Sequence, residues 1–139
     1  MLQPKLISGF RYEDERGVLL HNNNADFSLV KRCYIIENSM TKPIKAWQGH
    51  KIEQRWFIPI VGILVIKLIE IDNWISPNKF LPKLKFTLSS NSMNVLHIPQ
   101  GYVTSIESLE PDSKLLVMSD HRFKEIEDDY RYPIDYFTS

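Results

Sequence analysis

Short apolar runs separated by turn residues are the feature that most limits what this chain can fold into. Runs of about 4 to 8 residues, rich in β-branched and aromatic side chains, recur between turns such as Pro99-Gln100-Gly101. Runs of this length are typical of strands. The pattern predicts an all-β sandwich or barrel, with strands that include Ser28–Glu37, Ile63–Ile71, Lys85–Leu88, Val95–Ile98 and Lys114–Met118.

One segment near the C-terminus has helical spacing instead. Phe123 and Ile126 lie three residues apart among acidic residues, and this predicts a short helix over His121–Tyr130. The aromatic stretch RYPIDYF follows it. Because so many aromatic side chains are costly to leave in water, we expect this terminal arm to dock on the body.

Composition and charge exclude several classes of protein. The 139 residues are 43% hydrophobic and include 17 basic and 17 acidic side chains, with no block of like charge. We therefore expect one domain over residues 1–139 that binds neither nucleic acid nor a membrane. The longest apolar run, Trp56–Ile66, is too short to span a bilayer, and charges near the N-terminus interrupt any secretory signal. We expect a cytoplasmic protein.

Polar side chains gather in the otherwise strand-like stretch Lys45–Gly62, KAWQGHKIEQRWFIPIVG. If this stretch is two strands joined by a bend, its polar groups lie together at the mouth of a barrel, where ligands bind. Residues 48 and 50 then point to the same side, because side chains alternate along a strand. The polar cluster comprises Gln48, His50, Glu53, Gln54 and Arg55.

Several short motifs, in order along most of the chain, resemble one known family. They are DERG (Asp14–Gly17), VKRCYII (Val30–Ile36), KAWQGHKIEQ (Lys45–Gln54), Gly62, IPQGY (Ile98–Tyr102) and LLVMSD (Leu115–Asp120). The chain resembles the cupin-fold nucleotide-sugar isomerases: the dTDP-4-dehydrorhamnose 3,5-epimerases and, more closely, the dTDP-4-oxo-6-deoxyglucose 3,4-ketoisomerases. The resemblance implies a cupin-type double-stranded jelly-roll barrel, usually a homodimer. It also implies action on a dTDP-linked 4-keto-6-deoxy sugar, made for surface polysaccharides.

The implied reaction is proton transfer next to a ketone. It needs a general base near the carbon, a cation or donor near the enolate oxygen and an acid, but no redox cofactor. The ketoisomerases carry an arginine-glycine-aromatic-His-x-His-lysine run; here the first histidine is Gln48 and the second is His50. An amide does not accept a proton at neutral pH. His50 is therefore the base or acid, with Gln48 bonded to the sugar, or it is a structural histidine in a barrel that only binds.

The metal-binding pattern of cupins is mostly missing from this chain. It requires His-x-His, a glutamate and a further histidine, and the corresponding places hold Gln48, His50, Arg55 and Thr104. A cationic arginine repels a divalent ion, and the single Cys33 supports neither a structural zinc site nor an internal disulfide. We predict no metal and no other cofactor.

Three arginines are candidates for binding the ligand. Arg55 stands where the epimerases carry a lysine, so it stabilises an enolate or holds a phosphate, or else it pairs with a nearby glutamate. Arg16 in DERG is implied to contact the nucleotide diphosphate, often across the dimer; the alternative is a turn with a solvated charge. Arg32 shares a strand face with Tyr34, and the ketoisomerases present both residue types to the pocket. The alternative there is a strand of mixed burial.

Three further candidates follow from the resemblance. Tyr102 comes after the PQG turn and stacks on the ligand or packs in the core. Thr104 replaces a histidine common in the epimerases, and His121 replaces a ketoisomerase tyrosine after the Ser-Asp pair. We assign catalysis to His50, Tyr34 and His121, and we count Tyr102 and Thr104 among the substrate-binding residues.

Two functional hypotheses follow from these departures. In the first, the chain is a nucleotide-sugar 3,4-ketoisomerase or epimerase whose acid and base are rebuilt around His50. In the second, it is a non-catalytic cupin that binds a sugar nucleotide with Arg16, Arg55 and the pocket. A purely structural dimerisation module is a third possibility, but it leaves the polar cluster unexplained.

Overall fold

The chain is described by a computed structural model over residues 2–138. Within these residues there are twelve strands and no helix, so none that is long and apolar enough to cross a membrane. The strands are β1 (Lys5–Ile7), β2 (Phe10–Asp14), β3 (Gly17–His21), β4 (Arg32–Ile36), β5 (Ile44–His50), β6 (Arg55–Val61), β7 (Ile63–Glu70), β8 (Leu84–Ser89), β9 (Val95–Ile98), β10 (Tyr102–Ser108), β11 (Lys114–Ser119) and β12 (Tyr130–Arg131).

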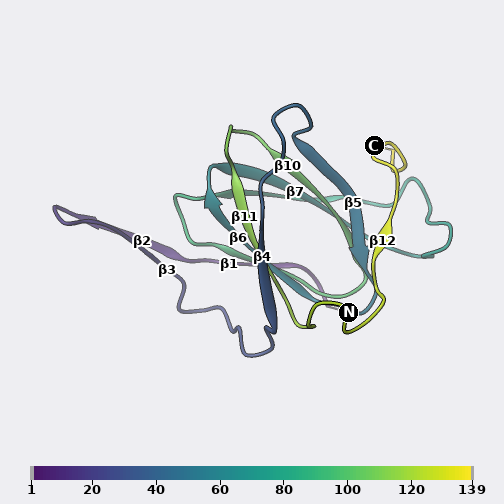
Figure 1. Ribbon diagram of the computed structural model, residues 1–139, viewed down its shortest axis with the longest axis horizontal. Helices are drawn as coiled ribbons and strands as arrows, with labels where there is room; N and C mark the ends of the chain where they lie inside the picture. The colour runs from purple at the N-terminus through teal and green to yellow at the C-terminus, as the bar shows by residue number, and fades with distance from the viewer. Residues whose placement is uncertain (1, 139) are drawn as a thin grey trace.

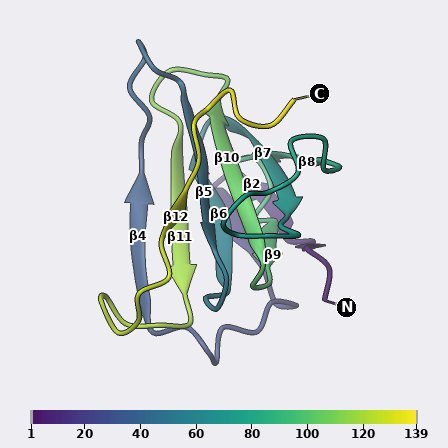
Figure 2. The same ribbon diagram turned by 90° about the vertical axis from the view of Figure 1, so that its right-hand side faces the viewer.

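Two five-stranded sheets make up the body of the molecule. Their strand orders are β1-β9-β6-β11-β4 and β12-β5-β10-β7-β8, and neighbouring strands are antiparallel. The third sheet is the hairpin β2-β3, which extends away from the body (Figure 1). This architecture is the predicted all-β jelly roll, and Figure 2 shows β4 beside β11, its neighbour in the first sheet.

The core lies between the two five-stranded sheets. Side chains of β7 alternate: Leu64, Ile66 and Leu68 are buried in this core, while Ile69 is buried in a second cluster on the outer face. This strand is therefore covered on both faces. The outer layer is the C-terminal arm, whose Phe137 meets Trp47 edge-on with ring centroids 5.3 Å apart.

Glycines allow the tight turns that set strand lengths. Gly62 joins β6 to β7 with a φ of 82°, and Gly101 precedes β10 with a φ of 98°. Both values lie in the left-handed region that side-chain-bearing residues avoid. The predicted turn at Pro99-Gln100-Gly101 is thus confirmed, and it places the start of β10 beside the end of β5, where Tyr102 pairs with His50.

Two predictions about local structure are wrong. The helix expected over His121–Tyr130 does not form: residues 121–129 make turns, and Lys124 has a φ of 60°, which no helix tolerates. The backbone carbonyl of Asp128 instead binds His50 at the end of β5, and its carboxylate accepts the N–H of Lys51. These contacts keep residues 121–129 from closing into a helix. The strand expected over Ser28–Glu37 begins only at Arg32, because residues before it form a turn in which Asp26 accepts the Ser28 N–H.

Candidate active site

The bend between β5 and β6 is held by two carboxylates from the C-terminal side of the chain. Asp128 accepts the backbone N–H groups of residues 51, 52 and 53, at 2.9, 2.9 and 2.8 Å. Asp120 accepts the N–H of the next residue, Gln54, at 2.9 Å. Every N–H of the bend therefore has a charged acceptor, and hydrogen bonds to charged groups are the strong ones. The predicted pair of strands joined by a bend is confirmed, with its geometry fixed.

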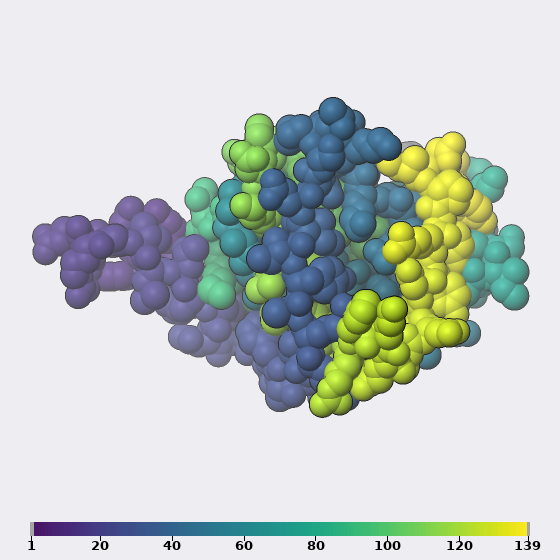
Figure 3. All heavy atoms as spheres, in the orientation of Figure 1, coloured from purple at the N-terminus to yellow at the C-terminus, as the bar shows by residue number. Residues whose placement is uncertain are grey.

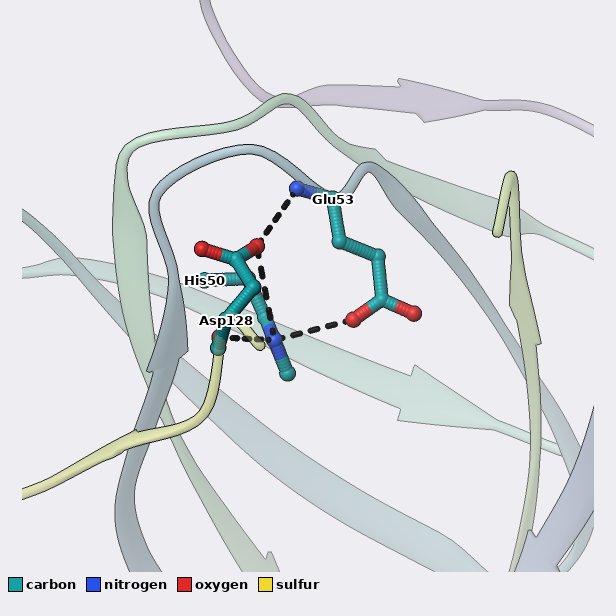
Figure 4. Close-up of side chains that lie close together, drawn as sticks. All are labelled: His50, Glu53 and Asp128. Atoms are coloured by element: carbon teal, nitrogen blue, oxygen red, sulfur yellow. Dashed lines mark hydrogen bonds and ion pairs between the residues drawn. The ribbon is translucent and has the colours of Figure 1, made fainter. Parts of the chain in front are cut away.

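His50 ends β5 with its imidazole oriented by this bend. Its Nδ1 lies 2.8 Å from the carbonyl oxygen of Asp128 and 2.9 Å from Oε2 of Glu53 (Figure 4). Both neighbours are acceptors, so Nδ1 carries a hydrogen. The other ring nitrogen, Nε2, is buried and has no hydrogen-bond partner among the described residues. A neutral His50 therefore has an unused lone pair at Nε2, which is what a general base requires.

Glu53 is a buried carboxylate that remains ionised. Burial by itself raises its pKa, but hydrogen bonds from His50 and Ser119 and the charges of His50 and Arg55 outweigh that effect and lower the pKa to about 2. Arg32 adds an ion pair, with its guanidinium nitrogen 3.5 Å from Oε1. The constant negative charge orients His50 and stabilises its protonated form once it accepts a proton.

Gln48 is oriented by a different carboxylate. Its Nε2 donates to Asp129 at 2.9 Å, and Asp129 also accepts from Nε of Arg131 at 3.1 Å. Burial raises the pKa of Asp129, but the bonds from Gln48 and Arg131 hold it below the ordinary value. An ionised carboxylate only accepts hydrogen bonds, so the amide NH₂ of Gln48 faces Asp129 and its Oε1 is left to accept from another group.

A cavity of about 310 Å³ brings five of the predicted residues together. Its wall is formed largely by the segment after β11, which lies beside β4 in Figure 3. The predicted residues that line it are Arg32, Tyr34, Gln48, His50 and His121, and Glu53 joins them. Arg32 lies 5.0 Å from the ring centre of Tyr34, as expected for neighbours on one strand face. The cavity combines a candidate base, a cation and an oriented amide.

Comparisons with known proteins identify the family. The family model described as FdtA, WxcM-like, C-terminal, matches residues 3–139. The chain belongs to this FdtA family. No curated protein sequence matches it.

Solved structures with the same fold agree with membership of the FdtA family. A mutant of the 3,4-ketoisomerase QdtA from Thermoanaerobacterium thermosaccharolyticum, in complex with TDP-4-keto-6-deoxyglucose, matches with a TM-score of 0.71 and 21% identity over 95% of this chain and 90% of that one. The TDP-quinovose 3,4-ketoisomerase WlaRB from Campylobacter jejuni matches with a TM-score of 0.69 and 20% identity over 95% of each chain. The dTDP-4-dehydrorhamnose 3,5-epimerase of Bacillus anthracis matches with a TM-score of 0.72 and 13% identity over 90% and 76%. The resemblance read from the motifs is confirmed.

Four predicted residues of this FdtA-family chain lie outside the cavity wall. Arg55 is buried behind it, donating to Oγ1 of Thr104 at 3.2 Å, and its charge acts on Glu53. Tyr102 lines a separate, mainly apolar cavity of about 460 Å³. Arg16 lies in the β2-β3 turn, pairs with Asp14 at 2.7 Å and is 82% exposed. Their roles toward a ligand stay predictions.

The cluster of His50, Glu53 and Asp128 has the composition of a metal site, with one ligand atom from each residue within 4.8 Å of the others. Its donor set does not suit a cation. Nδ1 of His50 carries a hydrogen, both oxygens of Asp128 accept backbone N–H groups, and Arg32 and Arg55 lie around Glu53. The prediction of no metal therefore rests on how these atoms are already used.

Sequence reasoning missed the residues that orient the site. Glu53 was expected in the polar cluster but not as the group that orients His50, and Asp128 and Asp129 were expected only as acidic residues of a helix. Asp128 lies 78 positions from His50 along the chain, so no local spacing links the two. The one clue in the sequence was the pair of adjacent aspartates just before the aromatic terminal arm, which was expected to dock on the body.

Proposed function

We propose that this chain is a sugar-nucleotide isomerase that acts by proton transfer next to a ketone. The substrate we propose is a TDP-4-keto-6-deoxyhexose, with movement of the ketone between carbons 4 and 3, or inversion at carbon 3, as the reaction. The observation that carries the proposal is the imidazole of His50, whose Nδ1–H is held by two acceptors while Nε2 has no partner. Membership of the FdtA family and the ketoisomerases of the same fold support it.

The roles of the cavity residues follow from their chemistry. Nε2 of His50 takes the proton from the carbon next to the ketone, and Glu53 stabilises the resulting imidazolium. Arg32 lies in the wall and supplies positive charge for the enolate oxygen or for a phosphate. Oε1 of Gln48 accepts a hydrogen bond from a sugar hydroxyl. Such a proton shift leaves the substrate at the same overall oxidation state, so no redox cofactor takes part.

The setting of the reaction is proposed on the same grounds. We place it in the cytoplasm, in the synthesis of sugars for surface polysaccharides, and in a homodimer in which Arg16 reaches the diphosphate. The side chain of Arg16 is 82% exposed, against 29% for Arg32 in the cavity, which is consistent with a contact to a ligand held elsewhere.

The test is incubation with TDP-4-keto-6-deoxyglucose in deuterated water, followed by proton NMR of the sugar. We expect deuterium to enter at carbon 3 and a 3-keto product to form, and we expect His50→Asn to lose both. Asparagine keeps a donor near the position of Nδ1 and removes Nε2, so the fold is retained. If the wild-type protein binds the sugar without any exchange, the enzymatic proposal is wrong.

A second function is favoured by one observation. Gln48 stands where the ketoisomerases carry a histidine, and its amide is tied to Asp129. A barrel with that change retains a site for a sugar nucleotide without the usual base, so binding alone is the alternative. Binding with no exchange in deuterated water is the result that this alternative predicts.

A further inference from the structure

A second oriented histidine lies in the wall of the same cavity. Nδ1 of His121 is 2.8 Å from Oδ1 of Asp120, which only accepts hydrogen bonds, so Nδ1 carries the hydrogen. The nearest acid to its Nε2 is Glu125, at 4.0 Å, which is beyond hydrogen-bond distance. His121 therefore repeats the arrangement of His50: one ring nitrogen is held by an acidic residue and the other is available.

Asp120 is itself held in place. It accepts both the backbone N–H of Gln54, at 2.9 Å, and the side-chain amide, at 3.2 Å. That amide uses its oxygen to accept from Nε2 of His97, at 2.9 Å, and the His97 ring is stacked on Trp56 at 4.9 Å. Turning Asp120 away would break each of these contacts, so its carboxylate fixes the orientation of His121 before a ligand arrives.

Ser119 connects the two histidines. It lies at the end of β11, fully buried, where its hydroxyl donates to Glu53 and accepts the backbone N–H of His121 at 3.1 Å. Glu53 in turn bonds to His50 at 2.9 Å. A continuous chain of hydrogen bonds therefore links the imidazole of His50 to the backbone of His121, and Asp120 fixes the His121 ring on that backbone, in the wall of the same cavity.

We propose that His121 is the second proton-transfer residue of this site and replaces the histidine that Gln48 has displaced. This inference rests on the proposed function. Tyr34, the other candidate, has no hydrogen bond among the described residues that would orient its hydroxyl, whereas His121 is oriented by a charged partner.

The proton balance defines the two roles. Nε2 of His50 removes the proton from carbon 3, the electron pair of that bond forms the double bond to carbon 4, and the old ketone oxygen takes a proton from solvent. His121, which enters this step with hydrogen on both ring nitrogens, then delivers its Nε2 proton to carbon 4 and keeps the Nδ1 hydrogen bonded to Asp120. The hydroxyl on carbon 3 loses its proton to solvent and becomes the new ketone, so the sugar loses and gains two protons. Solvent exchange returns both histidines to their starting states.

The experiment separates the two halves of the reaction. In deuterated water with TDP-4-keto-6-deoxyglucose, His121→Asn removes Nε2 but keeps a donor to Asp120. We expect deuterium entry at carbon 3 to remain within about threefold of wild type, while formation of the 3-keto product falls by about 100-fold or more. His50→Asn should lose both. Asp120→Asn keeps an acceptor oxygen for the Gln54 N–H but removes the charge that positions His121. It should slow product formation by about tenfold and leave exchange at carbon 3 in place.

The outcomes are distinguishable. If wild type makes product and His121→Asn makes it equally fast, the role of His121 is wrong while the proposed function stands. If His121→Asn binds TDP normally but loses exchange and product together, the division of roles is also overturned. His121→Gln serves as the second variant. The control is Cys33→Ser, at an exposed position on the opposite face of β4 from Arg32 and Tyr34, and it should retain both signals. Wild type with neither signal contradicts the proposed function and this inference together.

Discussion

Glu53 is stabilised as an anion by a hydroxyl, an imidazole and two arginines, and this makes the fold sensitive to acid. Its pKa is about 2 in the folded protein, against an ordinary value of 4.5 for a glutamate. A carboxyl group whose folded pKa is depressed contributes stability above its unfolded pKa and loses it as pH falls through the folded value. The contribution of Glu53 is therefore complete above pH 4.5 and disappears toward pH 2.

We predict that wild type loses on the order of 2–3 kcal/mol of unfolding free energy from this group between those limits. Glu53→Gln should be less stable than wild type at neutral pH, and its stability should depend less on pH in the acid range. Denaturant unfolding at a series of pH values measures both effects. Parallel curves for the two proteins would show that Glu53 is not the depressed group.

Gln48 leads to a prediction about selectivity. Because its amide nitrogen is fixed by Asp129, its oxygen is directed at one donor of the ligand, and we assign that donor to the sugar. Gln48→Met should weaken binding of TDP-4-keto-6-deoxyglucose by about 2- to 12-fold, the value of one neutral hydrogen bond, and leave the affinity for TDP unchanged. Calorimetric titration with each ligand gives the ratio. An equal loss for both ligands would mean that Gln48 supports the cavity and does not read the sugar.

At the scale of single residues, the sequence predicts which side chains share a strand face. It does not predict which hydrogen-bond partners hold those side chains in place. Alternation along β5 correctly places Gln48 and His50 together, since it depends only on strand geometry. The partners Asp128 and Asp129 lie far along the chain, and their pairing depends on how the terminal arm docks. No rule about the spacing of residues predicts where the terminal arm docks.

At the scale of elements, the bend at residues 51–54 depends on one carboxylate. Asp128 is 5% exposed and accepts three backbone N–H groups from it. We predict that Asp128→Ala costs about 3 kcal/mol or more of unfolding free energy, because buried donors lose a charged acceptor. Asp128→Asn should cost less, since one acceptor oxygen remains.

The matched control is the neighbouring Asp129, which bonds only to side chains of Gln48 and Arg131. Asp129→Ala should cost less than about 1 kcal/mol. Chemical denaturation of the three variants measures the difference. Equal losses for Asp128→Ala and Asp129→Ala would contradict the assignment of Asp128 as the acceptor that maintains the bend.

Most strands were predictable because short apolar runs and turn residues determine them locally. Val95–Ile98 is found as predicted, and β7 ends one residue earlier than expected. The prediction of a helix over His121–Tyr130 was wrong, because two apolar residues spaced three apart give only a weak preference for a helix. The hydrogen bonds that Asp128 makes to β5 and the bend outweigh it.

At the scale of the whole molecule, the β2-β3 hairpin extends from the body and exposes apolar side chains to solvent. Phe10, Tyr12 and Leu19 lie on one of its faces, according to the strand register, and are 60%, 56% and 59% exposed. Two-stranded hairpins are only marginally stable alone in water. We predict that a second copy of the chain covers this face and that the protein is a homodimer in solution.

The double variant Tyr12→Glu and Leu19→Glu should be monomeric, because it places charge on the apolar face. Arg11→Glu, on the opposite face of the same strand, is the control and should remain dimeric. Light scattering after size-exclusion chromatography measures the mass of each. A monomeric wild-type protein would contradict the prediction.

The orientation of His50 by Asp128 has a consequence for synthesis. The ribosome makes His50 and the whole bend 75 to 78 residues before the carboxylate and carbonyl that align them. A nascent chain that stalls after His50 but before Asp128 can already pair several of its strands. The imidazole of His50 in such a chain has no Asp128 to orient it. The proposed proton transfer therefore requires a chain that has been translated past Asp128 and whose last segment has folded back onto β5.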